Sequence, residues 1–326
     1  MNPNPYINED LQALAETVRR FADEKIKPGF LERDKTREFD RTLLREMGEL
    51  GFICPEVPEA FGGLGMGCVA AGVIHEEIAR ADLSFSYLNL LASLNSQILY
   101  KYGNSDVVQP WLDKLREGQA ICAIALTEPR GGSDAANLRL KIERDGDFYV
   151  INGEKTSISA ADQADITVVF GRTGTPESGA HGVTALLVPM DTPGLTTSRF
   201  DCHGQRSIGR GSIFFENVRV PVSHRLGDEN KGFVQVMHGQ SVPVRRNPRW
   251  RERTSSPKWA ASGAATAADA RALRQGLAAA ADYIAAALAI HTPRYAHGFT
   301  SCVHDHFTYP CPTARALGVG PSEETP

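Results

Sequence analysis

The stretch that decides the fold is Ala125-Leu126-Thr127-Glu128-Pro129-Arg130-Gly131-Gly132-Ser133-Asp134. It continues a compact apolar run, Ile121 to Leu126, that is typical of a buried strand. The two adjacent glycines let the backbone adopt positive φ angles and approach a flat ligand closely. Exposed N–H groups and hydroxyls in such a loop bind ring carbonyls and phosphates. A Gly-Gly-Ser-Asp loop after a strand is by itself more often an ordinary connection, so the flanking sequence has to decide.

Upstream of this loop the sequence is helical. Residues 8–27 repeat apolar side chains at three- and four-residue spacing behind a candidate N-cap, Asn8, and Pro28 is expected to stop this helix. Further helices are predicted over residues 40–50, 67–80, 83–102 and, capped by Ser105, 105–115. We therefore predict an all-helical N-terminal domain over residues 1–119.

Downstream of the loop the sequence changes to short β-rich runs separated by Gly and Pro. Strands are predicted at residues 148–153, 166–170, 183–188, 213–215 and 218–220. These runs predict a small antiparallel β-domain over residues 120–239, built as a sandwich or a barrel. Together with the helical domain, this places the chain in the α+β class.

Composition excludes several classes of function. The 326 residues suggest about two domains, and a net charge of −4 gives no reason to expect a nucleic-acid partner. No run approaches ~18 apolar residues, so no membrane span is expected, and the N-terminus lacks the features of a secretory signal. Six cysteines without CxxC spacing predict reduced thiols in a cytoplasmic protein without a metal site.

The character of the sequence changes again after Gly239. Residues 1–239 carry 25 basic and 33 acidic side chains, a net of −8, whereas residues 240–326 carry 10 and 6, a net of +4. Residues 260–290 contain 16 Ala in 31 positions, which allows a helix over 267–290. Residues 240–326 are therefore predicted to be an atypical tail, either an off-frame reading of GC-rich DNA or a genuine replacement domain. The run His304-Asp305-His306 matches no standard zinc spacing and is attributed to chance.

Residues 8–239 contain an ordered series of motifs. This series decides whether the Gly-Gly-Ser-Asp loop is an ordinary connection or part of a binding site. The series resembles the acyl-CoA dehydrogenase family of flavoenzymes. It begins in the helical part with Leu50-Gly51-Phe52 and with Pro55-Glu56-x-x-Glu59-x-Phe61-Gly62-Gly63. It continues with Thr127 to Asp134, Ile151 to Ser159, Val188 to Gly194, Phe215 to Pro221 and Gly227 to Phe233.

The resemblance implies a helical domain, a middle β-domain and a C-terminal four-helix domain, with FAD between the last two. By motif position, Ile124, Leu126 and Thr127 would face the isoalloxazine and pyrimidine side of FAD, followed by Gly132 and Ser133. Ser133 would also lie near the acyl-CoA. A second flavin-contacting strand would contain Ser157, Ile158 and Ser159.

Plainer interpretations of these residues remain open. Ile124 and Leu126 suit the core of a strand, and Thr127 and Ser133 suit local turn hydrogen bonds. Glu128 and Asp134 are expected to orient the loop rather than react.

Two segments depart from the family pattern. Ser157 stands where an aromatic residue commonly shields the ring, whereas Ser159 keeps a hydroxyl where the family usually has Thr. Ser207-Ile208-Gly209-Arg210 replaces the usual Ser-(Asp/Asn)-Thr. Both departures indicate a divergent subgroup.

The reaction implied is FAD-dependent α,β-dehydrogenation of an acyl-CoA thioester, in which a carboxylate removes the α-proton. Partners implied are the acyl-CoA, an electron acceptor such as an electron-transfer flavoprotein, and further copies of the chain. The usual C-terminal four-helix domain, which carries the base, is not recognisable after Gly239, so no catalytic residue is assigned.

The alternative function is that of a catalytically inactive, truncated flavin- or CoA-binding remnant or interaction module. A third possibility keeps the fold and changes the chemistry, as in related flavin monooxygenases and acyl-CoA oxidases.

Overall fold

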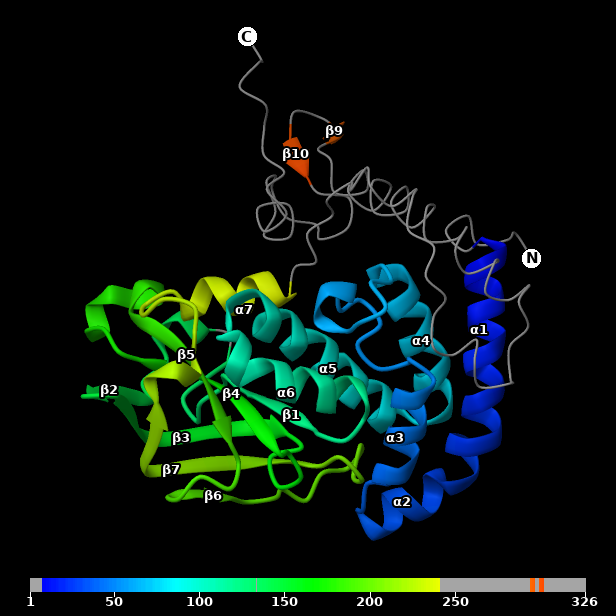
Figure 1. The fold of residues 1–326 in the computed structure, drawn as a ribbon, viewed down its shortest axis with the longest axis horizontal. Coiled ribbons are helices and arrows are strands. Elements are labelled where there is room, and N and C mark those ends of the chain that lie inside the picture. Colours follow the sequence, from blue (N-terminus) through cyan, green and yellow to red (C-terminus); the bar gives the residue numbers. More distant parts are fainter. Residues whose placement is uncertain (1–7, 133, 241–293, 297–298, 302–326) are drawn as a thin grey trace.

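A computed structural model describes residues 8–132, 134–240, 294–296 and 299–301 of the chain. The predicted helix over 267–290 and the His304–His306 run lie outside these residues. Figure 1 shows the helices of the N-terminal part beside a β-sheet, with α5 and α6 next to the strands. The α-helices are α1 (Glu9–Phe21), α2 (Phe30–Thr36), α3 (Arg41–Glu49), α4 (Cys68–Ala81), α5 (Leu83–Tyr102), α6 (Ser105–Arg116) and α7 (Gly232–Gln240).

The first helix begins as predicted but does not stop at Pro28. The Asn8 side chain accepts a hydrogen bond from the Leu11 N–H at 3.0 Å, which confirms the N-cap. The helical path then continues through a π-turn (Ala22–Ile26) and a 3₁₀ turn (Lys27–Gly29) into α2. Pro28 stands at the start of the 3₁₀ turn, where its missing N–H costs no hydrogen bond. The buried Arg33 guanidinium donates to the Ile26 carbonyl and so stabilises the π-turn.

The remaining predicted helices α3 to α6 are confirmed, with one change of cap. Asp40 caps α3 and Asp82 caps α5 through their side-chain oxygens. The prediction that Ser105 caps α6 was wrong, because Asn104 accepts the hydrogen bond from the Asp106 N–H at 3.0 Å. Ser105 is the first helical residue instead.

The eight strands of the β-part form one hydrogen-bonded sheet rather than the two sheets of a sandwich. Its order is β6-β7-β3-β2-β4-β5-β8, and β1 pairs with β4 off this path. The strands are β1 (Cys122–Ala125), β2 (Lys141–Asp145), β3 (Phe148–Ser159), β4 (Ile166–Arg172), β5 (Val183–Pro189), β6 (Leu195–Thr197), β7 (Arg210–Pro221) and β8 (Arg225–Leu226). Two further short strands, β9 (Arg294–Ala296) and β10 (Phe299–Ser301), pair only with each other.

Most pairs in the sheet are antiparallel, as predicted, but β4 is parallel to β1 and, at the single pair Lys141–Arg172, to β2. Cys122 pairs with Ile166 and Ala125 with Val169. The parallel pair arises because the chain makes the β2–β3 hairpin before it returns to β1, which gives the long connection that parallel strands need. Beyond the carboxyl end of β1, the Thr127 carbonyl accepts a hydrogen bond from the Thr156 N–H of β3.

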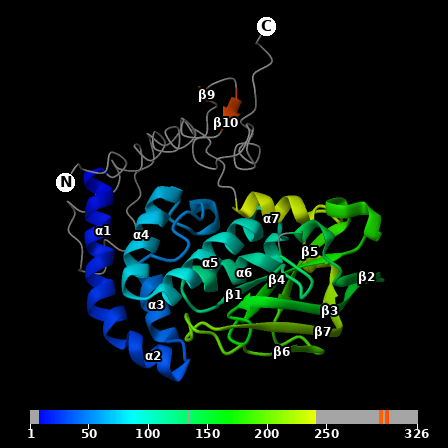
Figure 2. The same ribbon diagram turned by 180° about the vertical axis from the view of Figure 1, so that it is seen from behind.

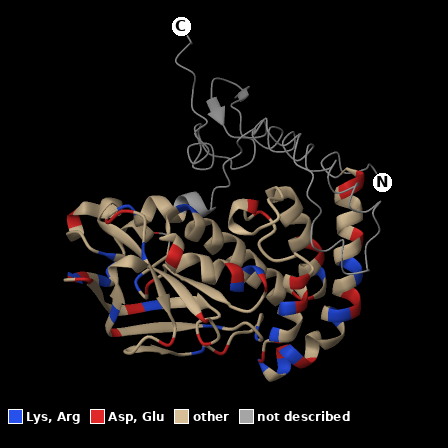
Figure 3. Cartoon of the chain, viewed as in Figure 1, with Lys and Arg blue, Asp and Glu red and all other residues tan. Residues whose placement is uncertain are grey.

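The core joins the helices to the sheet. Ile98 and Leu99 of α5 share one buried cluster with Val168 and Phe170 of β4. Figure 2, seen from behind, again shows α5 and α6 between helices α1 to α4 and the strands, whereas α7 lies beside β5. Figure 3 shows charges of both signs along α1 to α3, whereas α5 carries only Lys101. Within the described part of the chain, no helix is both long and apolar enough to cross a membrane.

Candidate functional site

The first predicted binding segment leaves the sheet at the carboxyl end of β1. Ile124 pairs with Val168 within the sheet, and its side chain is half-buried between two core clusters. Leu126 and Thr127, also half-buried, follow directly after the strand. The chain then closes a small loop in which the Gly131 N–H donates to the Glu128 carbonyl at 3.0 Å. The core interpretation of Ile124 and Leu126 therefore agrees with their packing, while both residues stay adjacent to the loop.

Glycine is needed at Gly131 rather than at Gly132. Gly131 has φ +153°, which residues with a side chain rarely adopt, and a Cβ there would meet nothing within 4 Å. Gly132 has no positive φ, and a Cβ would lie at ordinary contact distance, 3.4 Å, from Thr127 Cγ2. The loop therefore faces open space at Gly131. Ser133 lies outside the described residues.

The second predicted segment is the end of β3, where the strand contains a bulge. The pairing with β7 shifts register between Lys155 and Ile158. Ser157, inside the bulge, has φ +55° and an exposed side chain. Ile158 and Ser159 return to the ladder and are buried, with 2% and 8% of their surfaces exposed. The bulge thus turns the Ser157 side chain outward, while Ile158 and Ser159 stay in the sheet.

The structure brings these two segments together. The Thr156 N–H donates to the Thr127 carbonyl at 2.9 Å. The Lys155 ammonium donates to the Leu126 carbonyl, also at 2.9 Å. Strand β1 and the end of β3 therefore form one continuous surface, with the exposed Ser157 and the Gly131–Gly132 turn at its margin.

Glu128 lies beneath this surface and binds three groups. One carboxylate oxygen, Oε2, accepts from the Arg139 N–H at 2.7 Å. The other, Oε1, accepts from the Leu140 N–H and from Lys155 Nζ, each at 2.8 Å. Burial alone would raise the pKa of Glu128, but the Lys155 ammonium and the two amides outweigh it and lower this pKa.

Lys155 is a residue that the sequence analysis quoted but gave no role. Its side chain is fully buried, at 0% exposed. Burial lowers the pKa of Lys155 to about 8, and attraction to Glu128 limits the fall. The alternation of β3 carried a signal: Tyr149 and Ile151 point inward, and a period of two from them reaches position 155.

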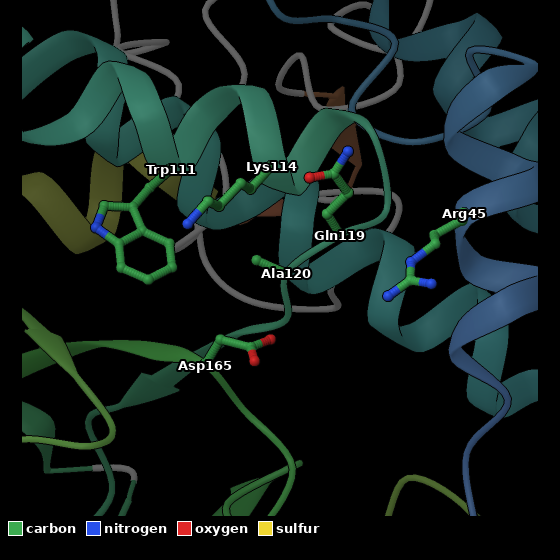
Figure 4. Close-up of a pocket in the computed structure, with 6 residues that line it drawn as sticks. All are labelled: Arg45, Trp111, Lys114, Gln119, Ala120 and Asp165. Atoms are coloured by element: carbon green, nitrogen blue, oxygen red, sulfur yellow. The ribbon is translucent and has the colours of Figure 1, made fainter.

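A separate surface pocket of about 450 Å³ lies at the opposite end of β1. Figure 4 shows Arg45 reaching toward it from α3, and Trp111 and Lys114 from α6; Gln119, Ala120 and Asp165 complete its lining. The Asp165 carboxylate accepts from Arg41 at 2.9 Å and from the Ile121 N–H at 2.7 Å, so it ties α3 to the start of β1. None of the predicted site residues lines this pocket.

Comparison with known families divides the chain into two matched parts. Residues 8–119 match the family model described as acyl-CoA dehydrogenase, N-terminal domain. Residues 123–218 match the one described as acyl-CoA dehydrogenase, middle domain.

Individual proteins show the same likeness. A probable acyl-CoA dehydrogenase, YngJ, of Bacillus subtilis (strain 168) is 38% identical over 235 residues, which are 71% of this chain and 62% of that protein. A glutaryl-coenzyme A dehydrogenase in complex with glutaryl-CoA superposes with a TM-score of 0.69 at 32% identity, over 73% of this chain and 61% of that one. A glutaryl-CoA dehydrogenase from Mycobacterium smegmatis in complex with FADH2 gives a TM-score of 0.66 at 28% identity, over 73% and 62%. The chain thus spans about three fifths of the length of the proteins it matches.

Proposed function

Because this chain belongs to the acyl-CoA dehydrogenase family through its N-terminal and middle domains, we propose that it acts in FAD-dependent α,β-dehydrogenation of an acyl-CoA thioester. The observation that carries the proposal is the junction of β1 with the bulge of β3 through Thr127 and Thr156. It supports the proposal because it joins the two predicted binding segments, which lie at the end of β1 and at the end of β3. The division into domains at residues 1–119, 120–239 and 240–326 stays a prediction.

The described residues fit FAD at this junction. Gly131 faces open space, so a flat group can approach the backbone there without meeting a side chain. We propose that Ile124, Leu126, Thr127, Gly132 and the segment Ser157–Ser159 hold the cofactor, with Ser133 contacting both cofactor and acyl-CoA. The FADH2 complex of the Mycobacterium smegmatis relative supports this choice of cofactor. When bound, FAD accepts the hydride from the β-carbon.

The chain's own contribution is to bind and orient the reactants. Ile124 and Leu126 offer apolar contact and exclude water from the ring, while Thr127 and Ser157 offer hydroxyls at the margin of the loop. No residue is assigned as the base that removes the α-proton. The thioester carbonyl needs hydrogen-bond donors as negative charge develops on it, and the exposed loop N–H groups are candidates for this task.

The inactive-remnant alternative rests on a specific observation. The motifs of the C-terminal helical domain are not recognisable in the sequence after Gly239. Under this alternative, the two matched domains bind flavin or CoA, or another protein, without turnover. The two interpretations of residues 240–326, an altered reading frame or a replacement domain, bear directly on this alternative.

We also propose the family's usual partners and setting. These are an acyl-CoA substrate, an electron-transfer flavoprotein as acceptor, a homo-oligomeric assembly and a cytoplasmic location. The proposed location rests on the scattered spacing of the six cysteines in the sequence.

Purified full chain tests the proposal. We expect it to bind FAD with the yellow absorbance of an oxidised flavin and to lose this colour when acyl-CoA is added without oxygen. A yellow protein that no acyl-CoA bleaches would favour the inactive remnant, and a protein that binds no FAD would contradict the proposal. Oxygen consumption during turnover would reveal the oxidase-type chemistry. Sequencing the gene across codons 235–245 would decide whether a single-base change restores a long helical frame.

A further inference from the structure

We propose that Lys155 and Glu128 are positioning residues for the cofactor surface: the buried pair holds the loop after β1 against the end of β3. This inference rests on the proposed function for its consequence, but the contact itself is a property of the fold. Lys155 Nζ lies 2.8 Å from Glu128 Oε1, and the two side chains are 0% and 9% exposed.

The pair acts in the segment between β1 and β2, whose described residues are tied to the sheet by backbone hydrogen bonds only near its two ends, at Thr127 and Leu140. Strand β1 ends at Ala125, and its register with β4 ends there too. Strand β2 begins only at Lys141, so the described residues 126–132 and 134–140 belong to no strand of the sheet. In this gap Glu128 accepts the N–H groups of Arg139 and Leu140, and Lys155 donates to the Leu126 carbonyl. Side chains therefore supply hydrogen bonds to the backbone of this segment, beside the two that the strands provide.

The position of the contacts ties the pair to the candidate site. Lys155 contacts the carbonyl of Leu126, and Thr156, next in sequence, donates to the carbonyl of Thr127. Leu126 and Thr127 are the first proposed cofactor contacts, and Ser157 begins the second set. A shift of the Lys155 ammonium would therefore move the cofactor contacts after β1 relative to those at the end of β3.

The chemistry of the pair favours positioning over stabilisation. Removing two charges from water costs most of what their attraction returns, so a buried ion pair is weak evidence for net stability. It does specify geometry, because an ammonium and a carboxylate lose much more when misplaced than two apolar groups do. Pairs of this kind support binding sites whose contacting groups need a defined separation.

The chain offers a matched control. Arg33 and Asp82 form a second buried ion pair at 3.0 Å, with side chains 10% and 1% exposed, between α2 and the start of α5. None of its hydrogen-bond partners belongs to the candidate site. Arg33→Met therefore removes a buried cation and leaves a buried carboxylate, as Lys155→Met does, but within the helical domain.

Two measurements on the full chain test the inference. The first is hydrogen–deuterium exchange without cofactor, read at the amides of Thr156, Arg139 and Leu140. The two variants are compared under conditions in which they have the same free energy of unfolding. We then expect these amides to exchange at least about tenfold faster in Lys155→Met than in Arg33→Met. The second is FAD titration, in which the dissociation constant should rise at least about tenfold in Lys155→Met and the visible spectrum of bound flavin should shift, with neither change in Arg33→Met.

Each result has a definite meaning. Equal exchange in the two variants would overturn the inference, as would an unchanged FAD dissociation constant and spectrum in Lys155→Met. If the unaltered chain bound no FAD, the proposed function would fail, while exchange would still decide whether the pair holds the loop. Should Lys155→Met not fold, Glu128→Gln replaces it, because Gln keeps the shape of the side chain and removes its charge. The same two measurements then apply.

Discussion

The Lys155 ammonium and the Glu128 carboxylate, 27 positions apart in sequence, meet at 2.8 Å inside the β-domain. Both belong to motifs that the resemblance placed beside the cofactor. Glu128 orients the loop after β1, as its three accepted hydrogen bonds show. Lys155 belongs to β3, and its contacts with Leu126 and Glu128 join that loop to this strand.

Breaking this pair should destabilise the chain strongly. Lys155→Met leaves a buried carboxylate without its cation, and we expect the free energy of unfolding to fall by about 3–5 kcal/mol. Urea unfolding measures it. The double variant Lys155→Met/Glu128→Gln should lose less than the sum of the two single variants, because the second change removes the uncompensated charge. Additive losses would show that the two side chains do not interact.

The stability of the chain should depend on His75 in mildly acidic solution. Burial lowers the pKa of His75 from 6.5 to about 4, so the folded chain keeps the ring neutral while the unfolded chain protonates it. Stability is therefore complete above pH 6.5 and is lost as the pH falls toward 4, by up to ~3 kcal/mol. Chemical unfolding between pH 4 and 7 measures this. His75→Gln should flatten the profile, whereas the same change at the exposed His203 should leave it intact.

A side chain at Gly131 should cost stability through the backbone alone. Because φ is +153° and a Cβ would meet no neighbour, Gly131→Ala is expected to lose about 1–3 kcal/mol. Gly132→Ala provides the comparison, since its Cβ lies at contact distance from Thr127 and φ is not positive. Thermal unfolding of both variants measures the two losses, and we expect the larger one in Gly131→Ala. Equal losses at the two positions would contradict the explanation.

Replacing Ser157 by glycine should relieve backbone strain and so stabilise the chain. This residue has φ +55° in the β3 bulge, and a left-handed conformation costs a residue with a Cβ about 1–2 kcal/mol. Ser157→Gly should therefore raise the free energy of unfolding by roughly 0.4–1 kcal/mol. The exposed Thr196 of β6 serves as control, because glycine in a strand should lower stability by about 0.5–1 kcal/mol. A loss at both positions would show that Ser157 is not strained.

Much of the helical domain could be predicted from local signals. Apolar spacing predicted α1 and α3 to α6, and Asn8 caps α1 as expected. The error at Pro28 has a physical cause: a proline ends a helix only where its N–H is needed, and here the chain passes through π- and 3₁₀-turns. The Arg33 guanidinium, which satisfies the Ile26 carbonyl, could not be assigned to this role from spacing.

Local sequence signals predicted α1, α3 to α6 and the strands β1, β3, β4 and β5 in their order, and the series of motifs indicated the family. They missed α2, α7, β2, β6 and β8, and they divided the single strand β7 into two. These signals are local, because propensity, capping and turn chemistry act over a few residues. Three features depend on long-range packing: β1 lies parallel to β4, Ser157 turns outward on a bulge, and Lys155 reaches Leu126 and Glu128. The reason is physical: a buried ammonium must find acceptors wherever the packed chain supplies them, and here they come from a loop 27 and 29 positions earlier.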